Sequence, residues 1–227
     1  MNESTVPLVE SLLVNDREAV YSGREALVEP KGAIEELVRR KDSAMPALIQ
    51  LVERYESEKE GRYYIEYVTE ILGRIGGNQS SELILRILLA YNDAELDDGS
   101  DMTCIRWLRK LASSAVPAMI RFVEKNYDQA FAVGDAAEAM EEIQDRRLIP
   151  LLLRLLKYPN YLVVQSALIS LGKQNDKSVV TRIIPFLKYN DENLAEQRET
   201  RELALLALES LLGDDEARLR GIKSQLR

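Results

Sequence analysis

Carboxylates that could bind a metal ion gather in one segment of the chain. Residues 92–101 read NDAELDDGSD, and several carboxylates in one flexible loop suit a hard cation such as Ca²⁺. However, Gly99 stands one position later than the glycine of an EF-hand loop, and Cys104 occupies the place of its closing bidentate glutamate. The spacing therefore favours a solvated loop, with Asp101 capping the next helix, over a metal site.

Residues that could act as nucleophiles lack the partners that would activate them. The chain has no histidine, so an imidazole metal site, a Ser–His triad and a histidine base are all excluded. Ser113 and Ser114 also lack a suitable lysine, and helix capping accounts for Ser114. Cys104 falls on the apolar side of residues 101–112, which predicts a buried, unreactive thiol. We therefore predict a protein that is not an enzyme and has no cofactor.

The glycine-rich segment 73–77, which reads GRIGG, does not form a phosphate-binding loop. It follows a predicted helix rather than a strand and lacks a following Lys-Ser/Thr pair. The segment predicts the end of a helix.

Composition limits the partners and the compartment. The chain has 227 residues, is 46% hydrophobic and carries a formal net charge of −8. The negative charge disfavours nucleic acid and anionic membranes as partners. No apolar run reaches the roughly 20 residues that span a bilayer, the N-terminus lacks a signal-peptide layout, and a single cysteine forms no internal disulfide. These features predict a cytoplasmic protein with no membrane partner.

An internal repeat predicts where the helices lie. Residues 43–54 (SAMPALIQLVER) and 114–125 (SAVPAMIRFVEK) share a polar start, a proline, an apolar stripe and a charged end. They begin 71 positions apart, which corresponds to two units of about 35 residues, the period of a helix-pair solenoid. A copy without proline lies near Leu83, and the other first helices are predicted to start at prolines: Pro7, Pro46, Pro117, Pro150 and Pro185.

Second helices follow corners that contain Asn or Asp. The corners are residues 14–16, 91–93, 127–128, 158–160 and 189–191. Residues 65–73 and 164–172 align as second helices, each with a final glycine predicted as a C-cap. A short extra helix is predicted over 33–40 and a capping helix over 214–227. The predicted core pairs Leu48, Leu51, Leu85, Leu88, Ile120, Leu152, Leu155 and Ile184 with Ile65, Val68, Leu72, Leu108, Met140, Ala167, Leu171, Leu206 and Leu211.

A tight Asn/Asp/Pro corner, a Val-x-x-Ala-x-x-x-Leu-Gly segment and a proline-started helix together resemble the HEAT repeat, particularly its short bacterial form. The likeness covers nearly the whole chain and is clearest over residues 147–187 and 65–77. It implies an all-α fold, a right-handed α-solenoid (superhelix) of about six antiparallel helix pairs, as a single domain over 1–227. Gln165 and Glu66 stand where the family usually has Arg, so its Asp/Arg ladder is not implied.

The resemblance also implies that the second helices line a concave side. Positions opposite their apolar faces are Tyr63, Glu66, Tyr67, Glu70, Arg74, Arg106, Trp107, Lys110, Asp135, Glu138, Glu142, Gln165, Ile169, Lys173, Arg198, Glu202 and Glu209. Because Tyr, Trp and Arg are common interface anchors, the predicted partner-binding residues are Tyr63, Tyr67, Glu70, Arg106, Trp107, Lys110, Asp135, Glu138, Glu142 and Gln165. The alternative is that the tyrosines wedge between helices and that Trp107 belongs to the core.

These expectations describe a monomeric, non-catalytic interaction module or adaptor that binds a protein or peptide on its concave face. A narrower version neutralises a basic partner, as an immunity protein does for a nuclease toxin. Two alternatives come from resemblance: phycobilin lyase-like chromophore handling, and a HEAT-like DNA glycosylase. The acidic charge and the single tryptophan disfavour the glycosylase.

Overall fold

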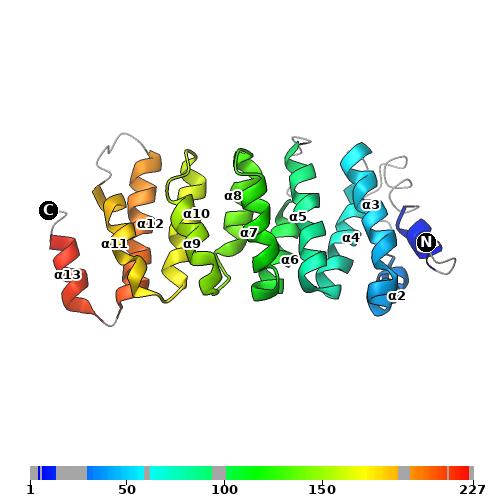
Figure 1. The fold of residues 1–227 in the computed structure, drawn as a ribbon, viewed down its shortest axis with the longest axis horizontal. Helices are drawn as coiled ribbons and strands as arrows, with labels where there is room; N and C mark the ends of the chain where they lie inside the picture. Colours follow the sequence, from blue (N-terminus) through cyan, green and yellow to red (C-terminus); the bar gives the residue numbers. More distant parts are fainter. Residues whose placement is uncertain are drawn as a thin grey trace. The chain divides into compact units, whose positions relative to one another are not determined.

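The structure is a computed structural model of the chain that describes residues 5, 7–13, 30–58, 62–93, 101–188, 195–213 and 215–224. These residues form helices and short connections and include no strand (Figure 1). The all-α prediction is confirmed. The chain divides into two compact units, Met1–Phe122 and Val123–Arg227. The grouping of all residues into one domain stays a prediction.

In the first unit each helix packs against its next neighbours. Residues 7–13 are helical, and the helices that follow are α2 (Lys31–Arg40), α3 (Met45–Glu58), α4 (Arg62–Ile75), α5 (Gly77–Asp93) and α6 (Asp101–Leu111). α3 contacts α4 and α5, while α4 contacts α2, α5 and α6. The helix α7 (Val116–Lys125) extends from this unit into the next. α2 confirms the predicted extra helix.

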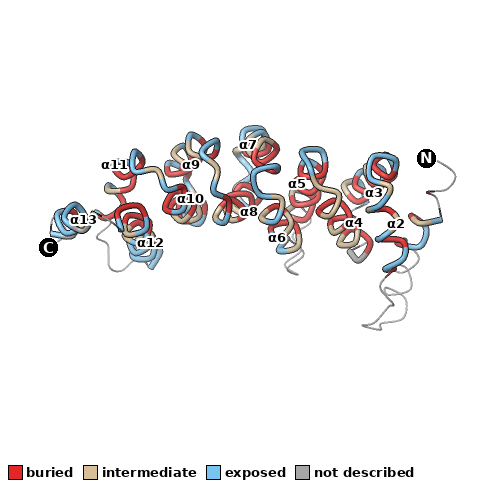
Figure 2. Tube along the Cα trace, turned by 90° about the horizontal axis from the view of Figure 1, so that it is seen from below, coloured by how far each residue is buried: buried red, intermediate tan, exposed pale blue. Residues whose placement is uncertain are grey.

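The second unit repeats this pattern of neighbours. Its helices are α8 (Ala130–Met140), α9 (Ile149–Leu155), α10 (Tyr161–Lys173), α11 (Val180–Ile183), α12 (Ala195–Leu212) and α13 (Glu216–Ser224), with a 3₁₀ segment η5 (Ile184–Lys188) after α11. α10 contacts α8, α9 and α12, and α12 contacts α11, η5 and α13. Figure 2 shows α8, α9, α10 and α12 with buried and exposed faces, as expected for amphipathic helices.

Prolines mark the starts of three first helices as predicted. α3, α7 and α9 each begin one residue before Pro46, Pro117 and Pro150, where a missing backbone N–H leaves no hydrogen bond unmade. The prediction for Pro185 is wrong, because this residue lies inside η5. The helical segment starts earlier, after Asp176 accepts a hydrogen bond from the Ser178 backbone N–H at 3.0 Å.

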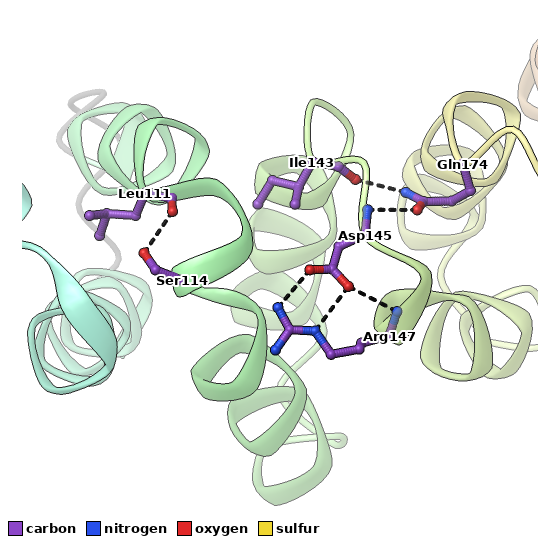
Figure 3. Close-up of polar contacts among 6 residues, drawn as sticks. All are labelled: Leu111, Ser114, Ile143, Asp145, Arg147 and Gln174. Carbon is purple, nitrogen blue, oxygen red and sulfur yellow. Dashed lines mark hydrogen bonds and ion pairs between the residues drawn. The ribbon is translucent and has the colours of Figure 1, made fainter.

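The duplicated serines terminate the preceding helix instead of capping the next one. Ser114 Oγ donates to the Leu111 carbonyl oxygen at 2.7 Å (Figure 3), and Ser43 Oγ donates to the Arg40 carbonyl oxygen at 3.1 Å. The predicted N-cap role of Ser114 is therefore wrong. Carbonyls in the last turn of a helix have no intrahelical donor, and each copy of the repeat supplies one from its serine.

Two glycines predicted as C-caps lie inside helices and allow close helix packing. A Cβ atom on Gly73 would stand 2.2 Å from Trp107 Cδ2, and one on Gly172 would stand 2.8 Å from Ala207 Cα. α4 continues to Ile75 and stops at Gly76, whose φ of +76° suits a helix end. The C-cap prediction is wrong for Gly73 and Gly172, and right for the glycine-rich segment as a helix stop.

Most of the predicted core is buried, with three exceptions. Ile120 and Ile184 are half-buried, and Leu206 is 58% exposed. Leu206 lies on the face of α12 opposite Ala204 and Leu208, which are both fully buried. Cys104 is buried, as predicted. Helix α13 confirms the main part of the predicted capping helix.

Ion pairs link successive first helices within each unit. The pairs are Glu56–Arg86, Glu82–Arg121 and Glu124–Arg154, with N···O distances of 2.5, 2.5 and 3.7 Å. Exposed pairs of this kind contribute about 0–1 kcal/mol each. They therefore add little to the stability of the fold.

Gln174 ties the loop after α8 to the end of α10. Its Nε2 donates to the Ile143 carbonyl oxygen at 2.7 Å, and its Oε1 accepts from the Asp145 backbone N–H at 2.9 Å (Figure 3). The Asp145 carboxylate then accepts from the Arg147 backbone N–H at 3.0 Å. A buried glutamine thereby satisfies two backbone groups of the preceding repeat.

Substituting Gln174 with alanine is expected to lower the free energy of unfolding by about 1–2 kcal/mol, because a donor and an acceptor are left without partners. Urea unfolding followed by circular dichroism measures the change. Gln144→Ala is the matched control, since Gln144 is exposed on the loop after α8, between Ile143 and Asp145. Equal stability of the two variants would show that the hydrogen bonds of Gln174 contribute nothing.

Candidate functional site

A groove of about 330 Å³ runs along the second helices of unit 2. Its lining comes from α8 and the residue after its last turn, from α10 and its N-cap, and from α12. The lining residues are Ala130, Phe131, Gly134, Asp135, Glu138, Glu141, Asn160, Leu162, Val163, Gln165, Ser166, Ile169, Glu199 and Leu203. The groove therefore lies on the helices that the sequence predicts to bind a partner.

Helix periodicity brings the groove residues of α8 onto one stripe. Phe131, Asp135 and Glu138 stand at positions i, i+4 and i+7, which share one face of an α-helix. The opposite face is rich in alanine and includes the fully buried Ala136 and Ala137. Alanine favours the helical conformation, and its small side chain lets α8 pack closely on its neighbours. Phe131, Asp135 and Glu138 on the other face stay exposed or half-buried.

Helix α10 lines part of the groove together with its cap residue Asn160. Asn160 caps this helix, since the Asn160 carboxamide oxygen accepts from the Leu162 backbone N–H at 2.8 Å. Leu162, Ser166 and Ile169 then follow at helical spacing and line the groove. Helical spacing thus places Leu162, Ser166 and Ile169 on the face of α10 that lines the groove.

Acidic side chains dominate the polar part of the groove. Asp135, Glu138, Glu141 and Glu199 contribute carboxylates, and the described lining residues include no lysine or arginine. A concave surface lined by one sign of charge concentrates the opposite charge near it. The groove therefore favours cationic groups.

Gln165 holds α10 to α12 and is not a solvent-facing residue. It is only 6% exposed, and its Nε2 donates to Thr200 Oγ1 at 3.2 Å and to Glu199 Oε2 at 3.4 Å. The predicted solvent-facing position of Gln165 is wrong, because α12 covers it. The contact positions Glu199 at the groove wall.

Two exposed apolar side chains stand at one end of the groove. Phe131 is 74% exposed and Leu162 is 49% exposed, and each is the second residue of its helix. Neither residue is among the partner-binding residues predicted from the sequence. The available signal was spacing, since Phe131 precedes Asp135 by four positions and Leu162 precedes Ser166 by four.

The predicted residues of unit 1 lie on α4 and α6, which contact each other. Arg106 and Lys110 are exposed. Trp107 packs on Gly73, and Lys110 Nζ lies 4.4 Å from the centroid of the indole ring. Trp107 therefore joins the two helices and is half-buried, so it is neither a fully exposed residue nor part of the core.

Of the predicted positions on α4, Glu70 and Arg74 take part in ion pairs. Arg74 pairs with Glu35 at 2.7 Å and with Glu70 at 3.3 Å, and the hydrogen bond to Glu35 raises the pKa of Arg74 above its usual value. Tyr67 is half-buried. The side chain of Tyr63 lies outside the described part of the chain.

Of the ten predicted partner-binding residues, the structure brings Asp135, Glu138 and Gln165 together in the groove. Glu142 is exposed and is not one of the lining residues. Most of the acidic segment 92–101 lies outside the described residues. In the ranges that the structure does describe, no group of three or more His, Cys, Asp or Glu side chains could hold a metal ion.

Neither a membrane-spanning helix nor a known family is found for the described chain. None of the described helices combines the length and apolarity that crossing a bilayer requires. No protein-family model matches the chain, and a comparison with curated proteins finds no match either. The resemblance to HEAT repeats stays a prediction from the sequence motifs.

Proposed function

We propose that the chain is a HEAT-like α-solenoid of about six helix pairs that acts as a non-catalytic interaction module. The recurrence of Pro46, Pro117 and Pro150 at helix starts supports this proposal. So does the packing of Gly73 and Gly172 against the next second helix in their units. Stacked helix pairs of this kind present extended surfaces to partners.

The binding site in this proposal is the groove of α8, α10 and α12. The observation that carries it is the exposure of Phe131 in the lining of a groove that combines apolar side chains with carboxylates. A large exposed apolar side chain in a concave surface is typical of an interaction site. A protein segment that buries the Phe131 ring would remove it from water.

A peptide-display selection on the full chain tests the site without assuming the chemistry of the ligand. We expect the enriched peptides to bind the double variant Phe131→Ala/Leu162→Ala at least 10-fold more weakly than the unsubstituted chain. Tyr67→Ala, in the other unit, is the control and should leave affinity unchanged. If the affinity of the peptides depends on Tyr67 and not on Phe131 and Leu162, the binding site lies on α4 and its assignment to the groove is wrong.

A further inference from the structure

The groove lining combines carboxylates with apolar side chains. Asp135 and Glu138 come from α8 and Glu199 from α12, whereas Ile169 and Leu203 come from α10 and α12. Apolar surface continues past the groove lining, because the exposed Leu206 stands three residues after Leu203 on α12. An occupant that matches this lining needs both cationic and apolar groups.

Gly134 lies in the groove lining and adds no side chain to it. Gly73 and Gly172 are required for packing, as shown above, but a Cβ atom on Gly134 would meet only Val163 Cγ2, at 3.8 Å, which is an ordinary contact. Glycine inside a helix is less favourable than alanine by about 1 kcal/mol. Gly134 lines the groove, so a larger side chain at this position would take up space that an occupant needs.

The size of the groove limits what it can hold. A volume of about 330 Å³ is at the small end of the range for ligand sites, about 300–1,000 Å³. It accommodates a few side chains of a chain segment, with the rest of the partner outside. Lysine and arginine suit such a site because their aliphatic stems pack on apolar surface while the charged end reaches a carboxylate.

Resting on the proposed function, we infer that the occupant of this groove is a basic protein segment. Its lysine or arginine side chains bind the carboxylates of Asp135 and Glu138, and an apolar side chain packs on Phe131 and Leu162. The charges of the groove and of the segment are complementary, so association is steered by electrostatics and weakens with salt.

The test uses fluorescence anisotropy with a labelled amphipathic peptide of leucine and lysine, and a second peptide in which each lysine is replaced by glutamine. We expect the glutamine peptide to bind the full chain at least 10-fold more weakly. The double variant Asp135→Asn/Glu138→Gln should lose at least 10-fold in affinity for the lysine peptide and should show a shallower dependence on salt.

A matched control removes the same amount of charge outside the groove. Glu142→Gln/Glu202→Gln should change affinity less than 2-fold, since both residues are exposed and neither lines the groove. Gly134→Leu fills the groove without changing charge, and we expect it to weaken binding at least 10-fold while the thermal unfolding curve does not move to lower temperature, since leucine favours the helix more than glycine does. If the control variant loses as much affinity as the groove variant, the attraction is only to the net charge and the inference is wrong.

The outcomes separate this inference from the proposed function. If neutral peptides from the display selection bind as tightly as basic ones and still need Phe131 and Leu162, the groove is a binding site, but the inference that its occupant is basic is wrong. If no peptide depends on Phe131, Leu162 or Gly134, the proposed function fails as well. If Gly134→Leu and Asp135→Asn/Glu138→Gln both lose binding and the control variant does not, the result supports the proposed function and the basic occupant together.

Discussion

Substituting Leu155 with alanine is expected to lower the free energy of unfolding by about 2–5 kcal/mol. Leu155 is fully buried in α9, which packs against α10. The substitution removes apolar contacts and leaves a cavity that the surrounding helices fill only in part. Urea unfolding followed by far-ultraviolet circular dichroism measures the loss.

Leu162→Ala provides a matched control because it removes the same atoms from a side chain that is 49% exposed. We expect this variant to lose less than about 1 kcal/mol, since little apolar surface returns to water. Similar losses for the two variants would mean that Leu155 is not packed between α9 and α10 as described. Trp107, the single tryptophan of the chain, lies in the other unit, so its fluorescence reports that unit separately.

The positions of the helices could be predicted from the sequence because they depend on local rules. Apolar residues recur at helical spacing, and Pro46, Pro117 and Pro150 occupy the first turns that tolerate proline. Pro185 shows the limit of this signal. Its helical segment begins earlier because a cap from Asp176 decides the start, and the proline then falls in a 3₁₀ segment.

The role of the helix glycines could not be predicted because it depends on residues far away in sequence. A Leu-Gly pair at the end of an apolar stripe is typical of a helix C-cap. In the structure Gly172 instead meets the backbone of Ala207, a residue 35 positions later. Only the packing of two second helices distinguishes the two roles.

The candidate site was predicted only in part, because part of it also depends on contacts between residues far apart in sequence. Asp135 and Glu138 follow from the periodicity of α8 alone. Gln165 has an equivalent position on α10, but α12 covers it and Thr200 accepts its hydrogen bond. Phe131 and Leu162 were missed because apolar residues in a first helical turn commonly pack against the core, and exposure depends on which neighbours are present.

The close approach of α10 and α12 leads to the second large expected effect. Gly172→Ala should lower the free energy of unfolding by about 2–3 kcal/mol. The added Cβ atom would stand 2.8 Å from Ala207 Cα and 3.1 Å from Ala207 Cβ. Backbone atoms cannot move aside as a flexible side chain can, so the two helices must separate. Urea unfolding of the full chain measures this loss too.

Gly134→Ala tests whether the loss comes from the contact and not from alanine replacing a helix glycine. Gly134 lies inside α8 with room for a methyl group, so the same substitution should stabilise the chain by up to about 1 kcal/mol through helix propensity. Opposite signs for the two variants are expected. A stabilising Gly172→Ala would mean that α10 and α12 do not approach this closely, and the positioning of Glu199 by Gln165 at the groove wall would then lose its structural basis.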